Sequence, residues 1–220
     1  MSFSKKGLLI FDLDGTVADT LYSIMEAVNM CMAHYGFQLK TYQEVRAAVG
    51  SGAKNLIMKT MPAEYAKDPE RAEEIYRYFQ KCYDQTYDHI EGCYAGMKEA
   101  MLELCARGYT LAVLSNKPDA YVKGIIYSLF DKKTVPLAMG ETSLPKKPDP
   151  TSAWYIAERL GFDVSECAFI GDSDVDIRTA KNAKMRSVAV SWGFREREAL
   201  VSLDPDFIID TPNGLVEIFE

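Results

Sequence analysis

Long apolar runs and a surplus of basic residues are both missing from this 220-residue sequence. No run of about 18 or more apolar residues occurs, and no charged n-region with the apolar h-region of a signal peptide opens the chain, so neither a membrane span nor an export signal is expected. Lys and Arg total 25 against 32 Asp and Glu, and the formal net charge of −7 should repel a nucleic-acid backbone. We therefore expect a cytoplasmic protein with no nucleic-acid or membrane partner.

Cysteine is sparse, and its spacing argues against two further classes of protein. The sequence has five cysteines, an odd number, and none of them forms a C-x-x-C pair. This usage fits reduced thiols better than a disulfide framework or a zinc site. Internal repeats and low-complexity tracts are also lacking, and the composition leaves the oligomeric state open.

Short apolar runs do recur, and helical patterns separate most of them. In the helical patterns, apolar residues return at intervals of three and four positions, as each helix would need to cover one face of a sheet. This alternation predicts an α/β domain with a mostly parallel sheet flanked by helices. The predicted strands are Gly7–Phe11, Tyr109–Leu114, Cys167–Ile170 and Ser187–Ser191, with weaker candidates at Val135–Met139 and Phe207–Ile209.

Residues from Ala18 to about Glu91 interrupt this alternation because they carry no strand signal. Apolar residues at helical spacing form one stripe from Leu21 to Tyr35 and another from Ile75 to Ile90. We predict an all-helical insertion after the first strand. The chain returns through E-G-C-Y-A-G, whose glycines suit a hinge.

Two aspartates follow the first predicted strand, in the sequence F-D-L-D-G-T. In an open parallel sheet, ligands bind beyond the carboxyl ends of the strands. Side chains two positions apart on an extended segment face the same way, so Asp12 and Asp14 should share a pocket, and Gly15 lets the backbone turn. A loop of polar turn residues explains this motif alone equally well.

Polar residues also follow the second long apolar run. Ser115, Asn116 and Lys117 offer a hydroxyl, an amide and an ammonium group to an anion, although S-N-K-P is also a common helix start. Further along, prolines in L-P-K-K-P-D-P fix the backbone, so that Lys146 or Lys147 could face the site. A solvated basic loop is the alternative for this segment.

A second acidic cluster, G-D-S-D-V-D, follows Cys167–Ile170 at the start of a predicted helix. Favourable interaction with the helix dipole would account for Asp174 and Asp176 but explains Asp172 less readily. Acidic residues at two strand ends should converge and repel one another. Oxygen-only ligands of this kind suit a hard cation such as Mg²⁺, with a phosphate group completing its coordination.

Taken in order, D-L-D-G-T, L-S-N-K-P, K-P-D-P and G-D-S-x-x-D resemble the motifs of the haloacid dehalogenase superfamily. The chain length and the helical insertion look like its phosphoglycolate phosphatase-like branch. This resemblance implies a Rossmann-like core from residues 1–17 and 92–220, with a helical cap from residues 18–91. It also implies a phosphatase for a small phosphorylated metabolite, with phosphoglycolate as the first candidate.

The resemblance further implies roles for the acidic residues. Asp12 would be the nucleophile that forms an aspartyl-phosphate, and Asp14 the general acid and then the general base. Mg²⁺ would bind Asp12, the Asp14 carbonyl and Asp172, with Asp176 as a ligand or a close neighbour.

Phosphate oxygens would be held by residues from two other motifs. The family pattern places its lysine directly before Pro148, which favours Lys147 over Lys146. The phosphate-binding residues implied in this way are Ser115, Asn116 and Lys147.

The helical insertion contains the glycine-bearing sequence V-G-S-G-A-K, which ends at Lys54. It lacks the spacing of a nucleotide-binding P-loop and follows a helical pattern instead of a strand. We expect a cap loop that faces the substrate, with Lys54 as a contact. A simple connection between two helices is the alternative.

Two other functions compete with the phosphatase. A β-phosphoglucomutase-like phosphotransferase would share every core motif and act on a sugar phosphate. A non-catalytic binding protein of the same fold is a more remote alternative, because every expected catalytic position is occupied. Asp14 separates the phosphatases from the dehalogenases, which lack this second aspartate because cleavage of a carbon–halogen bond does not require an acid for an alcohol leaving group.

Overall fold

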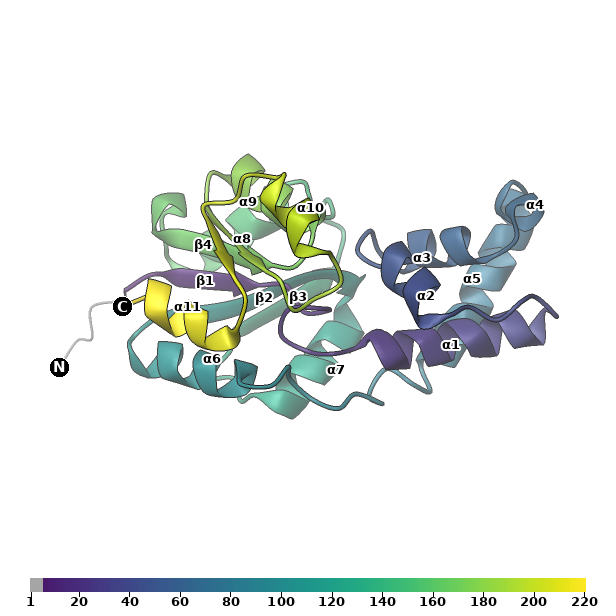
Figure 1. The fold of residues 1–220 in the computed structure, drawn as a ribbon, viewed down its shortest axis with the longest axis horizontal. Helices are drawn as coiled ribbons and strands as arrows, with labels where there is room; N and C mark the ends of the chain where they lie inside the picture. Colours follow the sequence, from purple (N-terminus) through teal and green to yellow (C-terminus); the bar gives the residue numbers. More distant parts are fainter. Residues whose placement is uncertain (1–5) are drawn as a thin grey trace. The chain divides into compact units, whose positions relative to one another are not determined.

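The computed structural model describes residues 6–220, which divide into two compact units (Figure 1). The first unit contains the chain up to Asp19 together with Gly92–Glu220, and the second is Thr20–Glu91. Val17 and Ala18 belong to the first unit because they pair with its backbone: Ala18 bridges to Asp14 and Cys93, and the Tyr94 N–H donates to the Val17 carbonyl.

A six-stranded parallel sheet forms the centre of the first unit, with the strand order β3-β2-β1-β4-β5-β6. All six predicted strands are present, which confirms the α/β prediction. Leu8 of the central strand β1 pairs with Thr110 on one side and Cys167 on the other. The strands are β1 (Leu8–Phe11), β2 (Thr110–Pro118), β3 (Leu137–Glu141), β4 (Cys167–Gly171), β5 (Arg186–Val190) and β6 (Phe207–Ile209).

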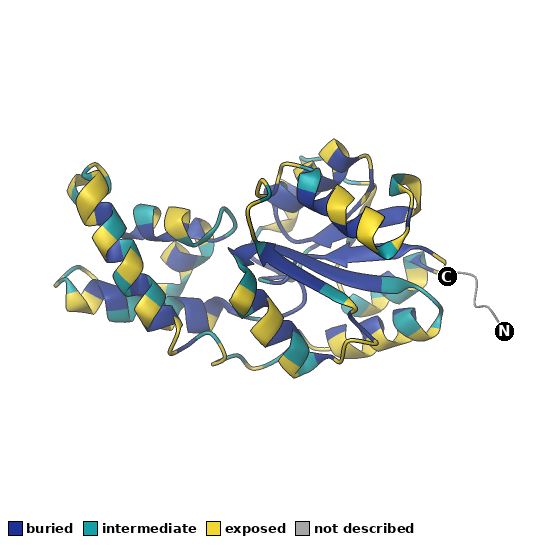
Figure 2. Ribbon diagram, turned by 180° about the vertical axis from the view of Figure 1, so that it is seen from behind, coloured by how far each residue is buried: buried dark blue, intermediate teal, exposed yellow. Residues whose placement is uncertain are grey.

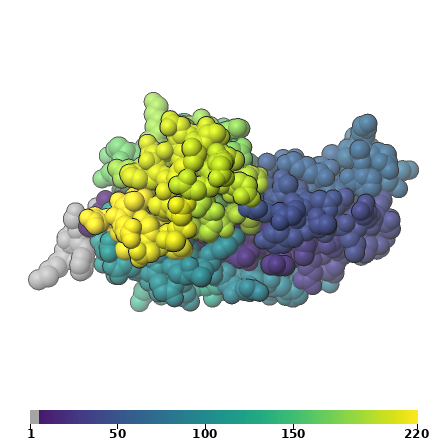
Figure 3. Space-filling model, in the orientation of Figure 1, coloured from purple at the N-terminus to yellow at the C-terminus, as the bar shows by residue number. Residues whose placement is uncertain are grey.

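Helices cover both faces of this sheet because each crossover between parallel strands is right-handed. The order reverses at β1, so α6 and α7 lie on one face and α8 and α9 on the other (Figure 1). Figure 3 shows the C-terminal segment, in yellow, over much of the visible surface of this unit. The helices are α6 (Met97–Ala106), α7 (Asp119–Leu129), α8 (Thr151–Leu160), α9 (Asp174–Ala183), α10 (Arg197–Val201) and α11 (Pro212–Ile218).

The core of the first unit is built on the central strands β1 and β4, which are buried along their whole length (Figure 2). All four residues of β1 are buried, as expected for a continuous apolar strand covered on both faces. Leu8 and Ile10 pack with Phe169 of β4 and Ile156 of α8. These contacts fix the position of the strand whose carboxyl end carries the first acidic motif.

All residues of the second unit are described, and they form five helices and no strand, as its apolar patterns predict. The long helices α1 and α5 pack on each other, and Cys31 and Ile75 are buried between them. Asp68 accepts from backbone N–H groups at the start of α5, and Pro69 occupies its first turn. The helices are α1 (Leu21–His34), α2 (Tyr42–Ala48), α3 (Ala53–Thr60), α4 (Ala63–Ala66) and α5 (Pro69–Tyr83).

No helix within residues 6–220 combines the length and the apolar character that crossing a membrane requires.

Candidate active site

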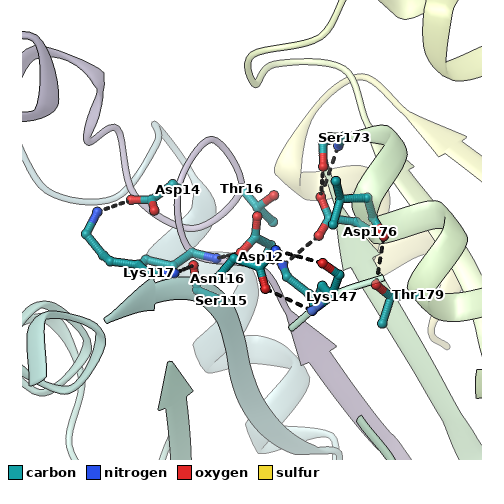
Figure 4. Close-up of polar contacts among 12 residues, drawn as sticks. Asp12, Asp14, Thr16, Ser115, Asn116, Lys117, Lys147, Ser173, Asp176 and Thr179 are labelled. Carbon is teal, nitrogen blue, oxygen red and sulfur yellow. Dashed lines mark hydrogen bonds and ion pairs between the residues drawn. The ribbon is translucent and has the colours of Figure 1, made fainter. Parts of the chain in front are cut away.

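The carboxyl ends of three neighbouring strands bring the predicted polar residues of the first unit together. Because β1 lies between β2 and β4, the segments that follow these strands meet at one edge of the sheet. Figure 4 shows side chains from these segments and from the loop before α8. The residues gathered here are Asp12, Asp14, Ser115, Asn116, Lys147, Asp172 and Asp176.

Asp12 is buried directly beyond β1. Its backbone N–H donates to the Ile170 carbonyl at 2.8 Å, and its Oδ1 accepts from the Leu13 N–H at 2.7 Å. Burial raises the pKa of Asp12 well above its ordinary value, the neighbouring ammonium of Lys147 opposes this, and the charges of Asp176 and other nearby carboxylates add to it. An anionic Asp12 therefore depends on a positive charge at this site.

Lys147 supplies such a charge. Its Nζ lies 2.9 Å from Asp12 Oδ1 and 2.7 Å from Asp176 Oδ1, and its side chain is buried (Figure 4). Burial alone would lower the pKa of Lys147, but the two carboxylates outweigh it and raise the pKa. Of the two candidate lysines, the structure brings this one to the site, whereas Lys146 is exposed and pairs with Glu141.

Asn116 holds the backbone that carries this lysine. Its Nδ2 donates to the Lys147 carbonyl and its Oδ1 accepts from the Lys147 N–H, both at 2.9 Å. The nearby Ser115 is buried, and its Oγ accepts from the Lys117 N–H at 3.3 Å. The amide of Asn116 therefore positions the lysine loop, a role that the sequence did not predict.

Asp12, Asp172 and Asp176 form a buried triad in which each residue offers an oxygen within 4.8 Å of the others. Asp176 Oδ2 accepts from the N–H and the hydroxyl of Ser173, which closes the first turn of α9. Asp176 therefore caps the first turn of α9 and also belongs to the acidic cluster, and its role as a metal ligand stays a prediction.

Asp172 is oriented by two donors that sequence analysis missed. Its Oδ1 accepts from Thr16 Oγ1 at 3.1 Å, and its Oδ2 accepts from the Phe194 N–H at 2.7 Å. Burial raises the pKa of Asp172, the charge of Asp176 adds to this, and the two hydrogen bonds oppose it. Phe194 follows β5, the strand beside β4 in the sheet. Its position after a strand end was the sequence signal that could have identified this donor.

Two glycines allow the backbone to approach Asp172 closely. A Cβ at Gly193 would lie 2.3 Å from the Gly15 carbonyl oxygen and from Asp172 Cβ, far inside van der Waals contact. Gly15 also has a φ of 85°, in the left-handed region that favours glycine. The site therefore requires glycine at both positions.

Asp14 does not share the lysine of Asp12. The chain leaves its extended path after Phe11, and the N–H groups of Thr16, Val17 and Ala18 donate to the Leu13 carbonyl. Asp14 consequently turns toward Lys117, whose Nζ lies 2.5 Å from Asp14 Oδ1 (Figure 4). The two aspartates therefore lie in one site but contact different lysines, because the chain forms a turn where the spacing argument assumed an extended segment.

The charges of the cluster indicate which kind of ligand it can hold. Four carboxylates, from Asp12, Asp14, Asp172 and Asp176, face two ammonium groups, which leaves a formal charge of −2. The triad offers only oxygen atoms, without sulfur or imidazole nitrogen. Such a donor set fits a hard divalent cation.

Lys54 lies in the second unit, at the start of α3. Its Nζ is 2.8 Å from Glu73 Oε2 of α5, and its side chain is exposed. The glycines before it connect α2 and α3, so the sequence is a helix-to-helix connection and not the strand-to-helix turn of a P-loop. A contact between Lys54 and a substrate stays a prediction.

Known proteins resemble this chain over nearly its whole length. The model of the haloacid dehalogenase-like hydrolase family matches residues 9–190. A phosphoglycolate phosphatase of Vibrio vulnificus strain CMCP6 is 31% identical over 216 residues, which cover 96% of this chain and 95% of that protein. One from Colwellia psychrerythraea is 31% identical and covers 98% of each chain. The crystal structure of a predicted phosphoglycolate phosphatase from Haemophilus somnus 129PT matches with a TM-score of 0.89 at 26% identity, over 100% of both chains.

Proposed function

The chain belongs to the haloacid dehalogenase-like hydrolase family, as a phosphatase, and on this premise we propose that it hydrolyses a small phosphate monoester through Asp12 and Asp14 with bound Mg²⁺. The observation that carries this proposal is the buried Asp12 carboxylate, which contacts Lys147 and forms the acidic triad with Asp172 and Asp176. Phosphoglycolate is the first candidate substrate, because relatives that match almost the whole chain are named phosphoglycolate phosphatase.

In the first step, an oxygen of Asp12 attacks phosphorus. The new bond to Asp12 forms as the bond from phosphorus to the leaving oxygen breaks, and a proton moves from the Asp14 carboxyl group to that oxygen. In the second step, Asp14 takes a proton from water as the water attacks the aspartyl-phosphate, which releases phosphate and restores Asp12. This division of labour requires the two carboxyl groups to carry different charges. They contact different lysines, so their surroundings are not the same.

The phosphate group requires positive or donor groups on its oxygens during both steps. The Ser115 hydroxyl and the Lys147 ammonium are buried close to Asp12 and can donate to them. Asn116 contributes by holding the Lys147 backbone. We assign phosphate binding to these three residues.

Asp12, Asp172 and Asp176 would hold the Mg²⁺ ion, with the Asp14 carbonyl as a further oxygen. The fit rests on the all-oxygen donor set and the formal charge of −2 of the cluster. When bound, the cation neutralises charge on the phosphate dianion and polarises its oxygens. Thr16 and Phe194 hold Asp172 in place for this role.

We also propose that the helical segment expected from residues 18–91, which forms the unit Thr20–Glu91, acts as a cap that selects the substrate, with the first unit as the catalytic core. Closing such a site excludes bulk water while the reactive intermediate exists. Lys54 is the residue of this cap that we assign to contact with the substrate. Its ammonium would suit a second negative group, such as a carboxylate.

Release of inorganic phosphate from a panel of metabolite phosphates, with and without Mg²⁺, tests the proposed function. We expect metal-dependent release, with phosphoglycolate among the best substrates. Transfer of the phosphoryl group to a second sugar phosphate, in place of release, would replace the hydrolase with a phosphotransferase. If no ester is turned over under these conditions, both the hydrolase and the phosphotransferase are contradicted.

A further inference from the structure

Lys117 and Asp14 form a largely buried ion pair, and the mechanism above assigns no step to Lys117. Their Nζ and Oδ1 atoms are 2.5 Å apart, and the two side chains are 5% and 13% exposed. Figure 4 shows the lysine reaching Asp14 on the side away from Lys147. Each of the two reacting aspartates therefore contacts a lysine of its own.

The backbone fixes the position of Lys117 near the end of β2. The pairing of β2 with β3 is irregular between Leu114 and Pro118, where the strand carries the polar segment. Here the Lys117 carbonyl packs so closely on Gly140 that a Cβ at that glycine would lie 2.4 Å from the carbonyl oxygen. The Lys117 N–H also donates to Ser115 Oγ. The backbone that carries the Lys117 ammonium therefore has little freedom to move.

Asp14 lies on a less regular element than its lysine. It is in the turn that follows β1, whereas Asp12 directly follows the strand and its Oδ1 is held by both the Leu13 N–H and Lys147. Proton transfer depends steeply on the placement of the donor. The Lys117 ammonium contacts one oxygen of this carboxyl group and so helps to fix its orientation.

We propose that Lys117 is a positioning residue for proton transfer by Asp14, an inference that rests on the proposed function. Lys117 holds Oδ1, so the proton travels on the other carboxyl oxygen, Oδ2. As the bond from Asp12 to phosphorus forms and the bond to the leaving oxygen breaks, this proton passes from Oδ2 to the leaving oxygen. Lys117 stays an ammonium ion throughout.

Two other roles for Lys117 predict different kinetics. A lysine that binds phosphate oxygens would serve every phosphate ester alike, because all esters share that group. A lysine that only stabilises the fold would also affect all substrates equally. A residue that acts through Asp14 matters most for an alkyl ester, whose alkoxide needs a proton, and least for an aryl ester with a good leaving group.

The test compares Lys117→Met with the unmodified chain on phosphoglycolate and on p-nitrophenyl phosphate. The readout is kcat/KM, which reports the steps up to release of the leaving group. We expect kcat/KM for phosphoglycolate to fall at least about tenfold more than that for the aryl ester. Lys123→Met is the matched control, since Lys123 forms an exposed pair with Asp119 at the same 2.5 Å, and it should leave both values unchanged.

A double-variant cycle tests whether Lys117 acts through Asp14. Once Asp14→Asn has removed the acid, adding Lys117→Met should cost little more on phosphoglycolate. The double variant also removes both charges of the ion pair, so it can be measured even if Lys117→Met alone unfolds because the buried Asp14 carboxylate has lost its ammonium partner. Equal losses on the two esters, or additive losses in the cycle, would overturn the inference. Full activity of Asp12→Asn would instead overturn the proposed function, whatever the effect of Lys117.

Discussion

The side chain of Asn116 and the backbone of Lys147 are joined at two points, by hydrogen bonds of 2.9 Å in opposite directions. The two residues are 31 positions apart in the sequence. Lys147 in turn contacts both Asp12 and Asp176. An amide at position 116 therefore sets where the buried ammonium lies relative to the proposed nucleophile.

Asn116→Asp should displace Lys147, because a carboxylate cannot donate to the Lys147 carbonyl. We expect kcat/KM to fall by about 10- to 100-fold and the free energy of unfolding by about 1 to 3 kcal/mol. Asn29→Asp is the matched control, since Asn29 makes the same pair of bonds to the Lys40 backbone in the second unit. That variant should lose stability and keep its kcat/KM. Equal kinetic losses in both variants would contradict a role in the site.

Asp12→Asn should abolish turnover, because it removes the attacking oxygen anion while nearly preserving the shape of the side chain. Binding of inorganic phosphate and the thermal unfolding temperature should stay close to those of the unmodified chain. Phosphate release and calorimetric titration measure these quantities. Mass spectrometry must show that the asparagine has not deamidated. Activity near that of the unmodified chain would remove Asp12 as the nucleophile.

Gly193→Ala should weaken binding of Mg²⁺, because the added Cβ would lie 2.3 Å from Asp172 Cβ and force that carboxylate to move. Calorimetric titration of the variant with Mg²⁺, without substrate, measures this directly. Gly36→Ala is the control, since a Cβ there meets nothing within 4 Å although its φ is 67°. It should lose only stability, about 1 kcal/mol. An unchanged dissociation constant in Gly193→Ala would show that Asp172 is not a ligand.

Stability without metal should fall as pH rises. Burial raises the pKa of Asp12 and Asp172 above the value of about 3.9 for an unfolded chain, so from about pH 4 upward the folded chain binds more protons than the unfolded chain. The free energy of unfolding in chelator should therefore be lower at pH 8 than at pH 5.

Excess Mg²⁺ should reduce or reverse this fall, because the cation binds the ionised carboxylates of the folded state. Denaturation curves in chelator and in Mg²⁺ at both pH values provide the comparison. Asp172→Asn, which removes one buried charge, should flatten the dependence in chelator. Stability that rises with pH in chelator would contradict the raised pKa values.

Lys54→Ala should raise KM for phosphoglycolate and hardly change hydrolysis of p-nitrophenyl phosphate, which lacks a second negative group. Glu73→Gln is a useful companion, because it removes the charge of the partner but keeps the lysine. It should not raise KM for phosphoglycolate. Equal losses on both esters would give Lys54 a structural role, and no loss on either would exclude it from the site.

The sequence alone predicted the six strands and the helical insertion, because each depends on local periodicity. A strand such as Leu8–Phe11 is apolar throughout since both of its faces are covered. The acidic motifs were also placed correctly at strand ends, because parallel strands present their carboxyl ends at one edge. The positions of these motifs were therefore enough to predict that Asp12 and Asp172 lie close together, without knowledge of side-chain contacts.

Only the tertiary structure determined which lysine each of the two aspartates contacts. Spacing predicted a shared pocket for Asp12 and Asp14, but it could not show that the turn after Phe11 brings Asp14 to Lys117, 103 positions away in the sequence. The choice of Lys147 over Lys146, the clamp by Asn116 and the approach of Gly193 to Asp172 depend likewise on packing between distant segments. Such contacts leave no periodic pattern in the sequence, because they are set by how the loops pack once the sheet has formed.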